Sequence, residues 1–269
     1  MRKKIFFHAV SILLLLVFTS NLLADEEYSF FRNIGEDFKY LISFPTRLNN
    51  ESALVTLGLI GVGGAILAST DEKLKNYVQD HRTSKLDDIS PSVRKIGDPF
   101  ADLGFLAVYG GSGYLLKNEK MQETALLSFE SFVVSNLIGG ALKVGAGRAR
   151  PNVGKGSANF SPFSIDENHT SFPSEHTLNA FSIASVFADE YDNPLVAVSA
   201  YSVASLVAMQ RIYENKHWAT DVFAGALIGT FVGKSVVHLH KKKNKESALF
   251  VPTVNPGEGS YGMDVVWRY

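Results

Sequence analysis

The sequence contains no cysteine in its 269 residues. This absence excludes disulfide bridges, thiol catalysis and metal sites built on cysteine. An excess of charge of one sign is also missing, since 26 basic and 27 acidic side chains give a net charge of −1. Nucleic-acid-binding domains usually carry an excess of Lys and Arg, so nucleic acid is not an expected partner.

Long apolar runs without a charged residue are scarce, although apolar residues make up 46% of the chain. The first run, IFFHAVSILLLLVF, follows the basic residues MRKK and precedes Ala24 and an acidic segment. A basic start, an apolar core and a small residue are typical of a secretory signal peptide, predicted here as residues 1–24. An uncleaved anchor helix is the alternative. In both cases the residues after Ala24 are expected to be exported.

Six later segments are apolar, rich in Gly and Ala, and too long for strands. They are 53–69, 100–116, 123–142, 177–191, 194–210 and 219–239. In the last of them Gly225, Gly229 and Gly233 recur every four residues, which lets helix backbones approach closely. The sequence therefore predicts an all-α fold, a helical bundle of about six core helices.

Four regions are expected along the chain: the signal peptide, an N-terminal amphipathic segment (25–52), a helical domain (53–245) and a C-terminal tail (246–269). The tail contains the turn residues NPGEGS, and aromatic residues alternate with smaller or polar ones near its end. This pattern predicts a short β-hairpin, which we expect to pack against the bundle.

The distribution of charged residues does not decide whether the protein spans a membrane. Only 53–69 and 194–210 are free of charge, and both are short for a membrane span of about 20 residues. Basic residues between 73 and 95 and the stretch KKKNK at 241–245 each favour a cytoplasmic position. If the chain starts outside the cell membrane and each of the six helices crosses it, these two basic stretches do not both reach the cytoplasmic side. Two alternatives remain, a membrane-spanning bundle and an exported, membrane-associated domain.

Three stretches carry the chemically interesting side chains, and each is expected at a helix end: KVGAGRARP (143–151), SFPSEHT (171–177) and RIYENKHWATD (211–221). Singly, each has a structural explanation, as a basic helix end, a capping histidine or a solvated turn. Together they supply three cations, a serine, two histidines and a carboxylate. These are Lys143, Arg150, Arg211, Ser174, His176, His217 and Asp221.

Such a set suits phosphoryl transfer without a metal ion, because Lys and Arg neutralise the phosphate oxygens as charge develops. One histidine can attack phosphorus while an aspartate four residues away orients it. The other histidine can protonate the leaving oxygen. A two-metal site would need several carboxylates, and none cluster here. Neither a metal nor a cofactor is expected.

These motifs resemble those of the type 2 phosphatidic acid phosphatase and vanadium haloperoxidase superfamily. The family's first motif, Lys, six residues and Arg-Pro, matches Lys143, Arg150 and Pro151. The second and third motifs match as well, at Pro173, Ser174 and His176 and at Arg211, His217 and Asp221. The resemblance covers roughly residues 53–239. It implies that His217 is the nucleophile, with Asp221 behind it, and that His176 is the general acid. Phosphate would be bound by Lys143, Arg150, Ser174 and Arg211.

Two positions depart from the family pattern. Gln210 replaces a serine and can still donate hydrogen bonds, whereas Glu175 replaces a glycine and brings a negative charge to an anion site. We expect Glu175 to point away and to form a salt bridge with Arg148. Arg148 and Lys155 could otherwise extend the cationic rim or be solvated.

The predicted function is a metal-independent phosphatase acting on a phosphate monoester or pyrophosphate, most plausibly of a lipid, with a membrane as partner. The predicted location is exported and facing the periplasm, either membrane-associated or integral. The alternatives are a nonspecific acid phosphatase for soluble esters, a lipid phosphotransferase and a vanadate-dependent haloperoxidase. A non-catalytic bundle that binds lipid headgroups is the remaining class.

Overall fold

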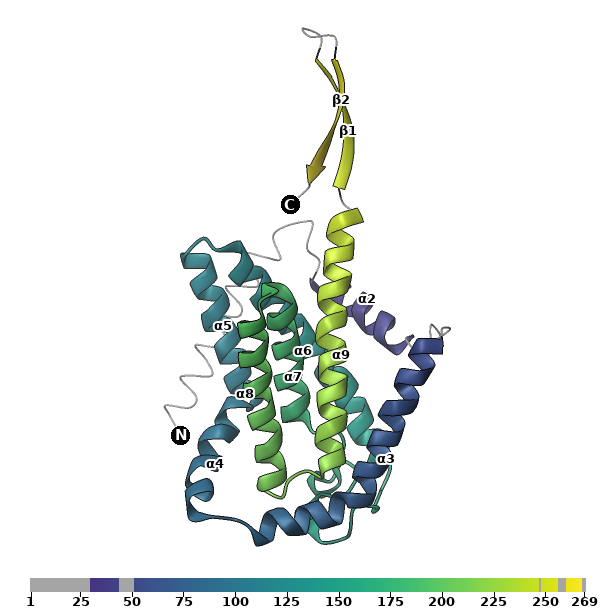
Figure 1. Ribbon diagram of the computed structural model, residues 1–269, viewed down its shortest axis with the longest axis vertical. Helices are drawn as coiled ribbons and strands as arrows, with labels where there is room; N and C mark the ends of the chain where they lie inside the picture. Colours follow the sequence, from purple (N-terminus) through teal and green to yellow (C-terminus); the bar gives the residue numbers. More distant parts are fainter. Residues whose placement is uncertain (1–29, 44–50, 247, 256–259, 268–269) are drawn as a thin grey trace.

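A computed structural model describes residues 30–43, 51–246, 248–255 and 260–267 (Figure 1). The elements are α2 (Phe30–Ile42), α3 (Glu51–Asp80), α4 (Ser84–Ile96), α5 (Pro99–Leu115), α6 (Glu119–Ala146), α7 (Glu175–Tyr191), α8 (Pro194–Tyr213), α9 (Ala219–Glu246), β1 (Ala248–Asn255) and β2 (Ser260–Trp267). All six segments predicted from apolar runs are helical, so the all-α prediction is confirmed. The predicted signal peptide lies outside the described residues.

Two helical stretches were not predicted by the apolar pattern. α3 continues well beyond the apolar run, through a polar segment that ends at Asp80, and α4 occupies a polar segment that contains Pro91. Thr83 caps α4, since its hydroxyl accepts a hydrogen bond from the backbone N–H of Leu86 at 3.3 Å. Most of α4 is exposed, so it lacks the apolar periodicity by which a helix is recognised.

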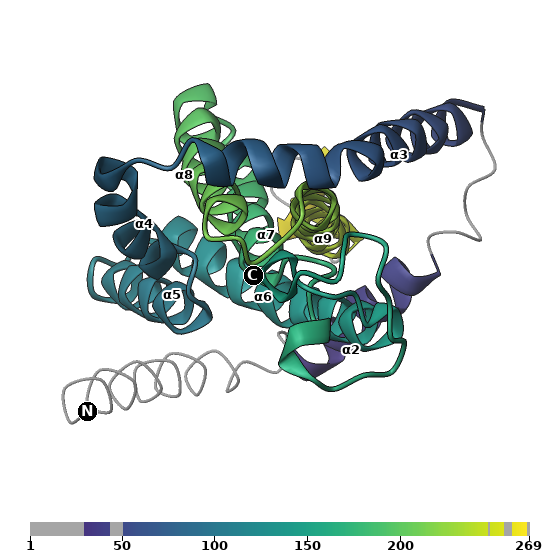
Figure 2. The same ribbon diagram turned by 90° about the horizontal axis from the view of Figure 1, so that it is seen from below.

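The glycine stripe of α9 packs closely against α7, which also contacts α6 and α8 (Figure 2). A β-carbon at Gly229 would lie 2.2 Å from the carbonyl oxygen of Leu178. One at Gly225 would lie 2.6 Å from that of Ser174. Because the neighbouring atoms belong to a backbone, a side chain does not fit at either position. The stripe therefore holds α9 against the first turns of α7.

Four helix ends meet at one end of the bundle. α6 and α8 finish there, with Lys143 and Arg211 in their last turns, and α7 and α9 begin there, with Ser174 as a cap and Asp221 in a first turn. The end of α3 and the whole of α4 lie at the same end (Figure 1). The up-and-down course of the helices thus gathers three stretches that are separated in the sequence.

Three of the described helices are long and apolar enough to cross a membrane: α6, α8 and residues 219–243 of α9. Large apolar side chains are exposed on α5 and α8, among them Phe105, Val108, Leu195 and Val198. These features support membrane association. The basic residues of 73–95 lie at the end where the four helix ends meet, whereas residues 241–243 lie at the other (Figure 1). The two basic clusters therefore cannot both be cytoplasmic if these helices span a membrane.

The predicted C-terminal hairpin is present as β1 and β2. The strands pair antiparallel, with Ala248 opposite Trp267 and Asn255 opposite Ser260. The hairpin projects beyond the end of α9 (Figure 1). The expectation that it packs against the bundle is therefore wrong.

Candidate active site

The first motif begins where α6 ends in a sharp turn at Gly147. This residue has a positive φ of 58°, and a β-carbon there would lie 1.8 Å from the carbonyl oxygen of Ser161, so glycine is required. The ammonium group of Lys143, one turn earlier, donates to the carbonyl oxygens of Pro173 at 3.1 Å and Thr170 at 3.3 Å. Lys143 is thereby fixed against the second motif.

The two arginines of the predicted phosphate site, Arg150 and Arg211, are each held by polar contacts. The Nε of Arg150 donates to the carbonyl oxygen of Glu167 at 3.0 Å, and its Nη2 donates to the hydroxyl of Thr170 at 3.1 Å. Arg211 is buried, and its Nη1 donates to the side-chain oxygen of Gln210 at 3.3 Å. The Nε of Arg211 has no partner among the described residues. A buried cationic donor without a partner is suited to binding an anion.

Ser174 and His176 stand at the beginning of α7. Ser174 is fully buried; its N–H donates to the carbonyl oxygen of Asp221 at 3.0 Å, and its hydroxyl accepts from that of Thr177 at 3.0 Å. The first amide groups of a helix favour the binding of an anion at its N-terminus. Burial and the positive charge of Arg211 lower the pKa of His176 to about 4. In the free site His176 is therefore neutral at pH 7.

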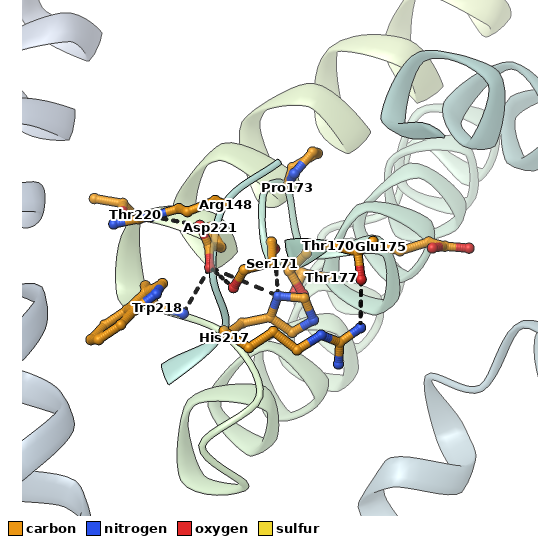
Figure 3. A network of polar contacts seen from close by, with 12 residues as sticks. Arg148, Thr170, Ser171, Pro173, Glu175, Thr177, His217, Trp218, Thr220 and Asp221 are labelled. Carbon is orange, nitrogen blue, oxygen red and sulfur yellow. Dashed lines mark hydrogen bonds and ion pairs between the residues drawn. The ribbon is translucent and has the colours of Figure 1, made fainter. Parts of the chain in front are cut away.

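His217 is buried, and a backbone carbonyl fixes its ring (Figure 3). Its Nδ1 lies 2.7 Å from the carbonyl oxygen of Ser171. Because a carbonyl only accepts, Nδ1 carries the proton and Nε2 keeps a free electron pair. Burial lowers the pKa of His217 well below its usual value. The positive charges of Lys143, Arg211 and Arg150 act in the same direction. The imidazole is thus held neutral, in a form that can act as a nucleophile.

Asp221 does not contact His217 in the way that the spacing predicts. Its Oδ2 lies 3.9 Å from Nδ1 of His217, too far for a hydrogen bond. The same oxygen accepts from the hydroxyl of Ser171 at 2.5 Å and from the N–H of Trp218 at 2.9 Å. Since the carbonyl of Ser171 accepts from the imidazole, the contacts link Asp221 to His217 through Ser171 rather than directly.

Arg148 and Asp71 extend this network into the protein. Arg148 is buried, with Nη1 at 2.6 Å from Oδ1 of Asp221 and Nη2 at 2.8 Å from Oδ2 of Asp71. Asp71 is also buried and accepts from the N–H of Thr220 at 3.0 Å. The sequence did not indicate Asp71, because 77 residues separate it from Arg148 and no local spacing links them.

Glu175 forms a salt bridge, as expected, but the expected partner Arg148 is wrong, because two buried carboxylates occupy Arg148. The partner of Glu175 is Lys143, whose Nζ lies 3.6 Å from Oε2. The side chain of Glu175 is 41% exposed and points away from His217 (Figure 3). The carboxylate therefore lies at the edge of the cation cluster, beside one of the predicted phosphate ligands.

The match to known proteins covers the part of the chain that carries the motifs. The PAP2 superfamily model matches residues 124–245. The lipid A 1-phosphatase of Porphyromonas gingivalis is 39% identical over 110 residues, which are 40% of this chain and 23% of that protein. A PA-phosphatase related-family protein of Dictyostelium discoideum is 30% identical over 163 residues, 54% of this chain and 60% of that protein. The chain thus spans less than two thirds of either relative.

Two solved structures share the fold. The PAP2 type phosphatidylglycerolphosphate phosphatase of Bacillus subtilis has a TM-score of 0.54 and 23% identity, covering 68% of this chain and 94% of that one. Aquifex aeolicus LpxE has a TM-score of 0.51 and 22% identity, covering 62% of this chain and 94% of that one. The predicted resemblance is therefore confirmed for residues 124–245, which match the PAP2 superfamily model and contain all three motifs.

Proposed function

We propose that this protein hydrolyses the phosphate ester of a lipid, a monoester or pyrophosphate, through a phosphohistidine intermediate and without a metal ion. One observation carries the proposal: the proton on Nδ1 of His217 is committed to the Ser171 carbonyl. The electron pair of Nε2 is then free, and the cations of the site are close enough to lower the pKa of the imidazole. A nucleophile and the charge that would hold its substrate are thereby combined.

In the first step, Nε2 of His217 attacks phosphorus and the bond to the leaving lipid oxygen breaks. The cations Lys143, Arg150 and Arg211, with Ser174 and the first amides of α7, hold the remaining oxygens. His176 donates the proton that the leaving oxygen needs. The negative charge of bound phosphate offsets the cations that lower the pKa of His176, so substrate binding itself favours the protonated acid.

In the second step, water attacks the phosphohistidine and the N–P bond breaks. His176 accepts a proton from the water, free phosphate leaves, and His217 returns to its starting form. The Asp221 carboxylate lies 3.9 Å from Nδ1 and stabilises the positive charge that the imidazole gains during transfer.

A lipid substrate is favoured over a soluble one by the apolar surface of the bundle. Three helices could cross a membrane, and α5 and α8 expose large apolar side chains. Lipid A 1-phosphatases from P. gingivalis and Rhizobium etli are among the similar proteins. Lipid A phosphorylated at its 1-position is therefore one of the first substrates to test, beside phosphatidic acid.

The proposal is tested with purified protein in detergent containing EDTA. Phosphate release is measured from lipid A 1-phosphate, phosphatidic acid and the soluble ester p-nitrophenyl phosphate. We expect kcat/KM for at least one lipid to exceed that for the soluble ester by about tenfold or more, with no effect of EDTA. Equal values would identify a nonspecific phosphatase, and phosphate found on an added lipid would identify a transferase. Activity lost in EDTA and restored by Mg²⁺ would contradict the metal-free mechanism.

We propose further that the active-site end of the bundle faces the periplasm, as the predicted signal peptide suggests. The absence of cysteine makes the test direct. Ile165 is 90% exposed in the loop at the active-site end, and Leu116 is 71% exposed in the turn at the opposite end. In intact cells, Ile165→Cys should react with a membrane-impermeant maleimide, and Leu116→Cys should react only after lysis. The reverse result would place the site in the cytoplasm.

A further inference from the structure

Glu175 brings a negative charge to the predicted phosphate site, at a position where the family pattern has glycine. It lies in the first turn of α7, directly before His176, and its Oε2 is 3.6 Å from Nζ of Lys143. A phosphate oxygen that accepts from Nζ of Lys143 would lie ~2.9 Å from that nitrogen. The carboxylate is therefore within about 6.5 Å of such an oxygen, a distance at which two negative charges repel each other.

Lys143 does not need Glu175 to hold its position. Its ammonium group donates to the carbonyl oxygens of Pro173 at 3.1 Å and Thr170 at 3.3 Å. An ammonium group has three donors, so one of them is left for phosphate while both carbonyls are engaged. Removing the carboxylate should therefore leave the lysine in place, and the charge of Glu175 can be tested apart from the geometry of the site.

The orientation of Glu175 places its charge on the side of the leaving group. In-line attack by His217 puts the leaving oxygen on the opposite side of phosphorus. The side chain of Glu175 is partly exposed and points away from His217 (Figure 3). The proposed acid His176 is the next residue of the same helical turn, and it must reach the leaving oxygen to protonate it.

A second carboxylate lies near the proposed acid. Burial and the charge of Arg211 lower the pKa of His176, and the charge of Asp98 opposes this effect. Asp98 is the N-cap of α5, so the beginning of that helix stands beside the imidazole. The leaving group would thus be flanked by the carboxylates of Glu175 and Asp98, whereas the transferred phosphate would be flanked by cations.

A cation on α4 also acts on the site, since the charge of Arg94 affects Arg211. Its side chain is exposed, whereas Glu175 is half-buried. Water and salt screen an exposed charge more than a partly buried one. Repulsion is therefore expected to prevail in the space for the leaving group.

We propose that Glu175 restricts the enzyme to phosphate monoesters by repelling the second phosphate of a diphosphate. The proposal rests on the function proposed above, which admits both kinds of substrate. In a diphosphate the leaving group itself ends in a phosphate, which would lie beside His176 and Glu175. In a monoester only the ester oxygen and the uncharged start of the lipid lie there. The site thus selects its substrate by a repulsive element as well as by attraction.

The test compares two lipids that differ by one phosphate, phosphatidic acid and diacylglycerol pyrophosphate with the same acyl chains. The terminal phosphate is labelled with ³²P, so only the first hydrolysis is counted. Glu175→Gln keeps the size of the side chain and removes its charge. We expect this variant to raise the ratio of kcat/KM for the pyrophosphate to kcat/KM for phosphatidic acid by about tenfold or more.

Two further variants show whether the charge at this position is responsible. Glu119→Gln removes the same charge from an exposed side chain at the start of α6, roughly 36 Å from Lys143 at ~1.5 Å per residue. Its ratio should equal that of the wild type. Glu175→Asp keeps the charge and should stay below Glu175→Gln. An unchanged ratio in Glu175→Gln, or an equal rise in Glu119→Gln, would overturn the proposal.

A binding measurement separates failure of this proposal from failure of the proposed function. Dissociation constants for inorganic phosphate and inorganic pyrophosphate are measured by calorimetry in the wild type and in Glu175→Gln, which requires no turnover. The variant should strengthen the binding of pyrophosphate about tenfold more than that of phosphate. An equal change for the two anions would refute selection by Glu175. If the wild type hydrolyses neither lipid, the function proposed above fails, and these constants still decide the role of Glu175.

Discussion

Replacing His217 with alanine is expected to lower kcat by at least about 10⁴-fold on lipid and soluble esters alike. The reason is that Nε2 of His217 is the atom proposed to bond to phosphorus, so its loss removes the covalent route for every leaving group. Rapid quenching of the wild type with ³²P-labelled substrate should trap a phosphoprotein that is labile to acid and stable to alkali, and His217→Ala should trap none. His238→Ala is the control, since His238 is exposed on α9 far from the site.

His176→Asn distinguishes the two histidines in the same experiment. A general acid matters most when the leaving group is a poor one, so this variant should slow the hydrolysis of phosphatidic acid by about 10²–10⁴-fold. It should slow p-nitrophenyl phosphate much less, because nitrophenolate leaves without a proton. If His176→Asn slowed the hydrolysis of both substrates equally, His176 would not be the general acid. Substantial turnover in His217→Ala would exclude His217 as the nucleophile.

The helices and the gathering of the motifs could be predicted from local patterns. A core helix can be predicted from the length of its apolar segment. The stripe from Gly225 to Gly233 predicts close contact between helix backbones, and this contact is made with α7. Each motif is predicted at a helix end, and an up-and-down bundle brings alternate ends together. The roles of the individual residues remain predictions, but their placement around His217 follows from these rules.

The contacts that hold the site depend on residues far apart in the chain, and the sequence did not indicate them. Asp221 was expected to orient His217 because residues four apart share a helix face, yet His217 precedes α9 and its ring turns to the carbonyl of Ser171. Every residue has a backbone carbonyl, so no residue type in the sequence identifies the one that accepts this hydrogen bond. Asp71 lies in a polar part of α3 that resembles any solvated helix face until the fold brings Arg148 to it. Long-range pairing of this kind is not encoded in local spacing.

Arg148→Met is expected to lower the stability of the protein by about 3–5 kcal/mol, because it leaves two carboxylates buried without their shared cation. Asp71 and Asp221 are both fully buried at the side chain, and each lies within 2.8 Å of the guanidinium. Arg148→Lys should rescue little, since one ammonium group cannot reproduce a planar fork between two partners. Thermal unfolding in detergent measures the change. Arg82→Met is the control, because Arg82 pairs with Asp87 at the exposed surface, where an ion pair contributes about 0–1 kcal/mol.

The double variant Arg148→Met, Asp71→Asn separates positioning from stability. Neutralising Asp71 removes one of the two unpaired charges, so the double variant should be more stable than Arg148→Met alone. Its activity should nevertheless stay about 10²-fold below that of the wild type. Asp221 would still lack the guanidinium that fixes it, and the ring of His217 depends on Asp221 through Ser171. Activity that returns together with stability would show that Arg148 only supports the fold. Activity that stays low in a stable protein would show that the geometry of His217 depends on a chain of contacts that begins on α3.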